Sequence, residues 1–405
     1  MKPILDELEE RIERAFRAAQ HDEARFPLMA CEALDRARLH EKITPEQILA
    51  WMCSDERLPE ASDPESRFGQ PSVTLRSADR FVVDALFWFD GTTSIHDHAF
   101  SGAFCLLHGS SIHTRYTFAE RAVLSSRMAI GELARNETEL LRRGDVRPIA
   151  GGAALTHSLF HLDRPSVSLV VRTRSEPAHL PQHRYFPPGV RVAPRPPDQR
   201  NLARVRALRV LRECASSAFE ANLSRAIRAT DLQGAFEIGL ELSGDPAVRE
   251  QVGGLVEEVH GAVAAVIRPA LRQAARQEQL IQMRSRFRDP GHRFFLGVLL
   301  NAPDREAARR LIAAREEGDP MRNVLRWVRE LSALPSTVSP TEPNALNLPL
   351  DEAALAFLEA WLAAPTEAEL ARRVGELTDH DPEQIALATR FFGLVRRHPL
   401  FESLA

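Results

Sequence analysis

A block of short β-rich runs between about residues 73 and 174 most constrains the fold of this chain. Glycine, aspartate and serine separate the runs, which include SVTLRS, RFVVDALFWF, GAFCLLHG, SIHTRYTF and VSLVVRTR. Short runs that are rich in β-branched and aromatic residues and bounded by turn residues are typical of strands. Several such strands in close succession predict an antiparallel barrel or sandwich.

Helical patterns lie on both sides of this block. Ile4, Leu8 and Ile12 recur at the spacing of one helix face, and Thr44 followed by Pro45 is a typical helix start. Helical periodicity returns after about residue 200 and continues to the end of the chain. We therefore predict an α+β fold in which an antiparallel β-barrel is flanked by N-terminal helices and a large C-terminal all-α domain.

Composition shifts suggest where the domains begin and end. Residues 176–200 contain seven prolines, which exclude a regular helix and indicate a linker or a strap laid over the barrel. The expected division is an N-terminal helical segment at 1–60, a barrel at 68–175, the proline-rich linker at 176–200 and an all-helical domain at 201–405.

Charge and cysteine content narrow the classes of partner and compartment. The net charge of −4 predicts neither a nucleic-acid nor a membrane partner. The four cysteines form no CxxC pair, which argues against a zinc finger or a disulfide framework. The N-terminus lacks the continuous apolar core of a signal peptide, so we expect a cytoplasmic protein.

Two histidines, His96 and His98, stand two residues apart after the apolar run FVVDALFWF. Residues i and i+2 of a strand face the same side, so both imidazoles can bind one metal ion inside a barrel. A third ligand should come from another strand, where the sequence offers His157 and His161. The spacing leaves both candidates open, and His161 could instead orient a ligand. His108 and His113 flank a turn, and we expect them at the surface.

These residues resemble the two motifs of the cupin superfamily, which implies a jelly-roll barrel. Gly91, His96, His98 and Gly109 match the first motif, although its glutamate position falls at Gly102 or Ala103. In the second motif, His157 matches the histidine, and His161 stands where the family has an asparagine. The carboxylate ligand of most cupins is therefore missing.

The run FWFDGTTSIHDH more closely resembles cysteine dioxygenase, the thiol-dioxygenase branch of the cupins. That resemblance implies Fe(II), or another divalent transition metal, held by His96, His98 and His157. It also implies dioxygen as co-substrate and matches Arg76 to an arginine that holds the substrate carboxylate. Of the family's Ser-His-Tyr relay only Ser168 is kept, because Val170 and Arg172 occupy the other two places.

The departures indicate a small-molecule substrate other than free cysteine, with a thiol or carboxylate group. A guanidinium can pair with an anion but cannot relay protons at neutral pH, so we expect Arg172 to hold an acidic group of the substrate. Two alternatives remain open. One is a non-catalytic ligand-binding or sensing cupin whose helical domain binds a partner. The other is an oxygenase whose helical domain docks a peptide or carrier-bound substrate.

Overall fold

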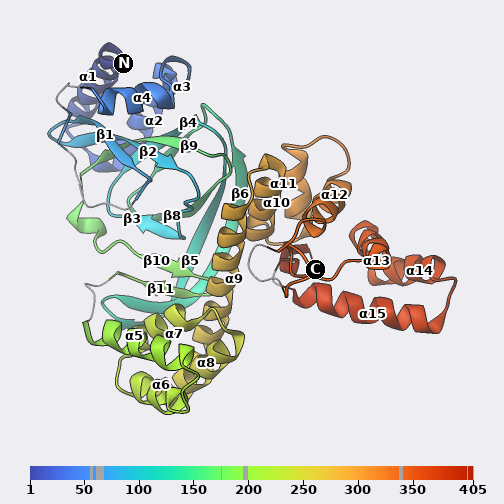
Figure 1. Cartoon of the computed structure of the whole chain (residues 1–405). Helices are drawn as coiled ribbons and strands as arrows, with labels where there is room; N and C mark the ends of the chain where they lie inside the picture. The colour runs from blue at the N-terminus through green and yellow to red at the C-terminus, as the bar shows by residue number, and fades with distance from the viewer. Residues whose placement is uncertain are drawn as a thin grey trace. The chain divides into compact units, whose positions relative to one another are not determined.

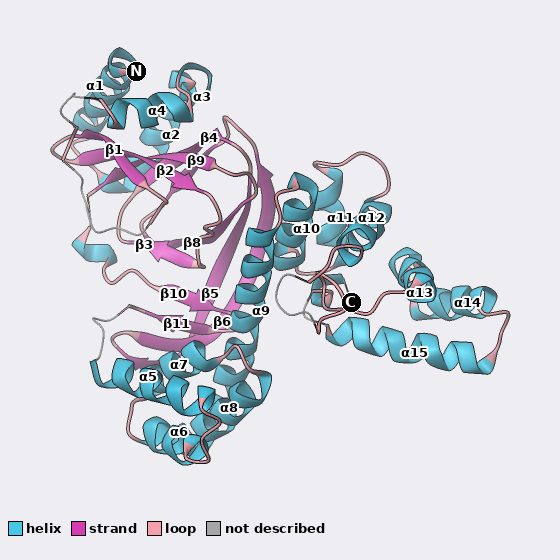
Figure 2. Cartoon of the chain, in the orientation of Figure 1, coloured by secondary structure: helices cyan, strands magenta, loops and turns pink. Residues whose placement is uncertain are grey.

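The computed structural model describes residues 1–54, 58–60, 68–174, 176–194, 199–336, 341–398 and 400–404. The chain divides into two compact units, each described here by itself. Unit 1 comprises Met1–Glu137 and Leu141–Glu278, and unit 2 comprises Thr138–Leu140 and Gln279–Ala405. Figures 1 and 2 show the strands of unit 1 together, with helices before and after them in the sequence.

Two antiparallel sheets build the core of unit 1. One has the order β1-β2-β9-β4-β7, and the other closes in the order β10-β11-β6-β5-β8-β3 because β10 also pairs with β3. The first sheet consists of β1 (Ser72–Ser77), β2 (Phe81–Trp88), β9 (Ser166–Thr173), β4 (Gly102–His108) and β7 (Val146–Ile149). The second consists of β10 (Arg184–Phe186), β11 (Val190–Val192), β6 (Met128–Leu141), β5 (Ser111–Ser125), β8 (Gly152–His161) and β3 (His96–His98).

The central strands of the first sheet are buried on both faces. Along β2, Val83, Ala85 and Phe87 pack into a core that they share with the N-terminal helices. Leu86 and Trp88 point the other way, into a second apolar cluster inside the barrel. Because side chains alternate along a strand, this pattern fixes which residues can reach the barrel interior.

Four N-terminal helices cover the outer face of this sheet, as Figure 2 shows. They are α1 (Lys2–Ala18), α2 (Phe26–Ala37), α3 (Leu39–Lys42) and α4 (Pro45–Met52). The predicted apolar face of α1 is buried, with Leu8, Ile12 and Phe16 no more than 1% exposed. Thr44 caps α4 through a reciprocal bond with Gln47, as the Thr-Pro start predicted.

The segment expected to be a linker or strap contributes two short strands, β10 and β11. Its prolines at 187 and 188 lie in the connection between these strands rather than within them. Val190 and Val192 of β11 pack with Met128 and with Phe236 in one apolar core. The helices of this core are α5 (Gln199–Glu213), α6 (Phe219–Arg228), α7 (Leu232–Leu242), α8 (Pro246–His260) and the first part of α9 (Ile267–Arg286). The core therefore crosses the expected boundary at residue 201.

Apart from the strand residues Thr138–Leu140, unit 2 is helical, and it begins in the second half of α9. Its helices are α10 (Pro290–Asn301), α11 (Arg305–Ala313), α12 (Pro320–Ser332), α13 (Glu352–Ala363), α14 (Glu367–Leu377) and α15 (Pro382–Arg397). Short 3-10 turns cover Glu23–Arg25, Pro177–His179 and Ala262–Val266 in unit 1 and Glu402–Leu404 in unit 2. The α+β fold class, with an antiparallel barrel between N-terminal helices and a large helical region, is confirmed. Within the described ranges, every helix is too short or too polar to cross a bilayer.

Candidate metal centre

The short strand β3 carries His96 and His98 into the barrel beside β8. His96 pairs in register with His157, and a register irregularity separates this pair from the pairing of His98 with Gly152. The three histidines are 2–3% exposed. Strand pairing therefore brings together residues that lie about 60 positions apart in the sequence.

The three imidazoles converge through their Nε2 atoms. His98 Nε2 lies 3.2 Å from His96 Nε2 and 3.3 Å from His157 Nε2. Two nitrogens that each sit about 2.1 Å from one ion, at angles of roughly 90–110°, are separated by about 3.0–3.4 Å. Within the described ranges, no other three histidine, cysteine or acidic side chains bring their ligand atoms within 4.8 Å of one another.

Two of the three outer ring nitrogens, those of His96 and His157, have hydrogen-bond partners, whereas His98 Nδ1 has none among the described residues. His96 Nδ1 lies 2.7 Å from the Ser94 carbonyl oxygen, so we assign the proton to Nδ1 and a lone pair to Nε2. His157 Nδ1 lies 2.9 Å from His113 Nε2, and we assign the proton of this contact to His157 Nδ1, which leaves a lone pair on His157 Nε2. His98 Nε2 faces both nitrogens but can donate to only one. A cation satisfies all three, so these residues fit a metal ion.

Burial keeps the three candidate ligands neutral. It lowers the pKa of His96, and it lowers the pKa of His98 and of His157 well below the ordinary histidine value. The neighbouring imidazoles add to the shift for His98 and His157. Neutral imidazole is the form that binds metal, so proton competition for this site is weak near neutral pH.

His113 was expected at the surface, and that prediction is wrong. The residue is 1% exposed, and it orients His157 from the barrel interior. The prediction placed His113 beside a turn at the surface, because SSIHTRY follows a turn sequence. In the structure the strand β5 already begins at Ser111. Two residues along the strand from Ser111, the side chain of His113 faces inward.

The structure brings His157, and not His161, to His96 and His98. His161 Nδ1 lies 2.9 Å from Ser111 Oγ, and its ring stacks on Trp88 with a centroid separation of 4.5 Å. His161 is thus part of the interior wall of the barrel beside Trp88. Phe68 contacts both Trp88 and His96 and is 43% exposed, so it lies where the interior approaches solvent.

Asp97, between the two histidines of β3, faces away from the centre. It accepts hydrogen bonds from the backbone N–H of His183 at 2.6 Å and from the Tyr185 hydroxyl at 2.9 Å. Burial acts to raise the pKa of Asp97, but the bonds from His183 and Tyr185 outweigh it and hold that pKa below its ordinary value. Asp97 therefore ties β3 to β10 and is not available as a base at the centre.

The two arginines considered as anion anchors are both held by carboxylates of the chain. Arg76 lies on the outer side of β1, where its guanidinium bonds Asp6 of α1 at 2.6 Å and approaches Glu9 at 3.4 Å. Arg172 lies on the interior side of β9, but Asp84 of β2 binds it at 3.0 Å. The structure thus places Asp84 where the sequence suggested a substrate anion.

Ser168 lies on the interior face of β9, between Leu86 on β2 and Leu106 on β4. It is 2% exposed, and its hydroxyl finds no hydrogen-bond partner among the described residues. The same holds for the indole N–H of Trp88. Both groups are neutral, and both lie beside the apolar cluster inside the barrel.

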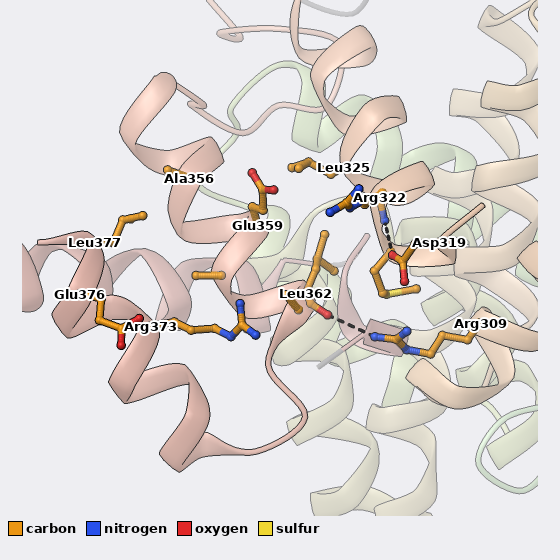
Figure 3. A pocket seen from close by; sticks show the side chains of 13 residues that line it. Arg309, Asp319, Arg322, Leu325, Ala356, Glu359, Leu362, Arg373, Glu376 and Leu377 are labelled. Atoms are coloured by element: carbon orange, nitrogen blue, oxygen red, sulfur yellow. Dashed lines mark hydrogen bonds between the residues drawn. The ribbon is translucent and has the colours of Figure 1, made fainter.

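Unit 2 contains a separate cleft of about 740 Å³, shown in Figure 3. Residues of α11 and α12 line one side, and residues of α13 and α14 line the other. Its charged lining residues are Arg309, Arg322, Arg373, Asp319, Glu359 and Glu376. Because the two signs balance, charge favours neither an anion nor a cation there, and the barrel remains the candidate site.

Comparisons with known proteins add little to this geometry. No protein-family model matches the chain, and no curated protein matches it. A cupin superfamily protein from Desulfitobacterium hafniense is 19% identical over 30% of this chain and 92% of its own, with a TM-score of 0.19. Oxalate oxidase in complex with glycolate is 16% identical over 42% of this chain and 82% of its own, with a TM-score of 0.21. We draw no functional conclusion from likenesses this weak.

Proposed function

We propose that the protein is a mononuclear metal-dependent oxygenase that uses Fe(II) and oxidises a small thiol other than free cysteine. The observation that carries this proposal is the convergence of three neutral, buried Nε2 atoms with separations of 3.2 and 3.3 Å. Imidazole ligands suit iron, copper, nickel and zinc. Three ligands on one face leave about three octahedral positions for substrate and dioxygen.

The ligand set favours oxidation over hydrolysis. A hydrolytic metal site commonly places a carboxylate beside the ion as general base. Here Asp97 faces away and is bonded to His183 and Tyr185, and Asp84 is engaged by Arg172. An all-histidine set contributes no negative charge, so an anionic thiolate from the substrate would offset part of the charge of the ion.

The chain's own residues would hold and shield this reaction. His96, His98 and His157 would bind the ion, and His113 would fix the orientation of His157. Phe100 and Phe104, whose rings contact His98 and His157, would exclude water from the centre. When bound, Fe(II) would supply the redox chemistry through which dioxygen oxidises the thiol.

Free cysteine should be a poor substrate because the two arginines expected to hold its carboxylate are both engaged by carboxylates of the chain. Arg76 lies on the outer face, and Arg172 is already paired with Asp84. The family's relay positions hold Val170 and Arg172 instead of histidine and tyrosine.

The test is oxygen uptake by the iron-loaded protein over a panel of small thiols. Conversion of a thiol RSH to the sulfinic acid RSO2H consumes one dioxygen for each thiol, and both product and stoichiometry can be measured. Turnover with at least one thiol, lost in His157→Ala, is the expected result. Stoichiometric iron without oxygen uptake on any thiol would favour the non-catalytic binding protein instead.

A further inference from the structure

An ion pair between the buried Asp84 and the partly exposed Arg172 lies on the interior wall next to the candidate metal centre. Arg172 Nε and Nη2 each lie 3.0 Å from Asp84 Oδ2. The Thr74 hydroxyl donates to the other carboxylate oxygen, Oδ1, at 2.8 Å. Asp84 is 4% exposed, so both of its oxygens are engaged in a nearly dry environment.

Strand alternation places this pair on the same side as the histidines. On β9, Val171 packs into the outer core while Val170 packs inside the barrel with Leu86 of β2. Arg172 is two residues beyond Val170, and Asp84 is two residues before Leu86. The pairing of β2 with β9 brings Asp84 opposite Val170, so Arg172 and Asp84 are diagonal neighbours on one face.

One aromatic ring separates the pair from the centre. The guanidinium carbon of Arg172 lies 5.3 Å from the centre of the Phe100 ring. The same Phe100 ring contacts His98 with a centroid separation of 4.9 Å. A substrate that extends from the metal past Phe100 would therefore meet this pair.

We propose that Asp84 is a specificity-determining residue that keeps Arg172 neutralised, so that a carboxylate at the end of the substrate opposite the metal gains no advantage over an uncharged group. This inference rests on the proposed function. A substrate carboxylate could use Arg172 only by leaving Asp84 as an unpaired buried charge, which is strongly unfavourable.

The experiment uses the full chain loaded with Co(II) and two nearly isosteric thiols. These are 3-mercaptopropionate, which ends in a carboxylate, and 3-mercaptopropionamide, which ends in a neutral amide. Binding of either thiolate to cobalt produces a charge-transfer absorption band, so the readout is a dissociation constant and needs no turnover. If no cobalt spectrum forms at all, the proposed function fails, and that failure is distinct from an unexpected ratio of the two constants.

Because Asp84 already occupies Arg172, the unaltered protein should bind 3-mercaptopropionate no more than about threefold more tightly than 3-mercaptopropionamide. Asp84→Asn releases Arg172, and the preference should shift toward the carboxylate by at least about tenfold, the size of one charge-assisted contact. The double variant Asp84→Asn/Arg172→Gln should lose that gain. Glu132→Gln, which removes the carboxylate of an exposed ion pair with Arg121, is the matched control and should change nothing.

Arg172→Met provides a second route if Asp84→Asn does not fold. It leaves Asp84 unopposed, so binding of 3-mercaptopropionate should weaken at least about tenfold relative to the amide. A tenfold preference for the carboxylate in the unaltered protein would overturn the proposal. So would an unchanged ratio in both Asp84→Asn and Arg172→Met.

Discussion

At the scale of single residues, the centre depends on a histidine that is not itself a ligand. His113 Nε2 lies 2.9 Å from His157 Nδ1 and holds the orientation of the His157 ring. Removing such an orienting partner typically lowers metal affinity by about 10- to 100-fold. We therefore expect His113→Ala to weaken Co(II) binding by a factor in this range, measured by competition with a chelator.

The matched variants for this prediction are His113→Gln and His108→Ala. The amide oxygen of the introduced glutamine can accept the same bond from His157, so His113→Gln should recover part of the lost affinity. His108 is the exposed last residue of β4, and its removal should leave affinity unchanged. Equal affinities in the unaltered protein and His113→Ala would show that His113 only fills space.

A site residue could be predicted from the sequence when its partner lies nearby in the chain or on a recognisable strand, and not when its partner is distant. His96 and His98 could be recognised because they stand two residues apart on one strand. His157 could be proposed as a third ligand because it lies on a later strand. Asp84 gives no local signal, because its partner Arg172 is 88 positions away and only the pairing of β2 with β9 joins them. His113 was missed because a turn sequence hid the start of β5.

At the scale of elements, α1 is held by a narrow stripe of buried side chains. Phe16 is 1% exposed, and its ring lies 4.6 Å from that of Phe26 at the start of α2. Truncating a buried phenylalanine leaves a cavity and costs about 3–5 kcal/mol of unfolding free energy. We expect Phe16→Ala to lower stability in urea by about that amount, whereas Leu28→Ala, at a position 71% exposed, should have little effect.

An unchanged urea midpoint in Phe16→Ala would contradict the role given to the outer core. Of the helices in this layer, α1 was predictable from its periodicity and α4 from the Thr44 cap. The strands β10 and β11 were not, because the prolines that surround them dominate the composition of the segment. Those prolines lie outside the three-residue strands, where no backbone N–H is needed for the sheet.

At the scale of the whole molecule, the two units should respond differently to metal. The candidate ligands all belong to unit 1, and a ligand stabilises only the structure that binds it. We expect added Co(II) to slow amide hydrogen exchange in β3 and β8 and to leave α10 to α15 unchanged, measured by mass spectrometry. Slowed exchange across α13 to α15 as well would show that the units are energetically coupled.

The central claim is that His96, His98 and His157 bind one metal ion. The most direct measurement is a spectroscopic titration of the metal-free protein with Co(II), alongside His98→Asn and His157→Asn and with exposed His108→Asn as control. We predict saturation at one equivalent in the unaltered protein and in His108→Asn, and loss of the high-affinity site in the other two variants. High-affinity binding that persists in both His98→Asn and His157→Asn would contradict the assignment of this centre.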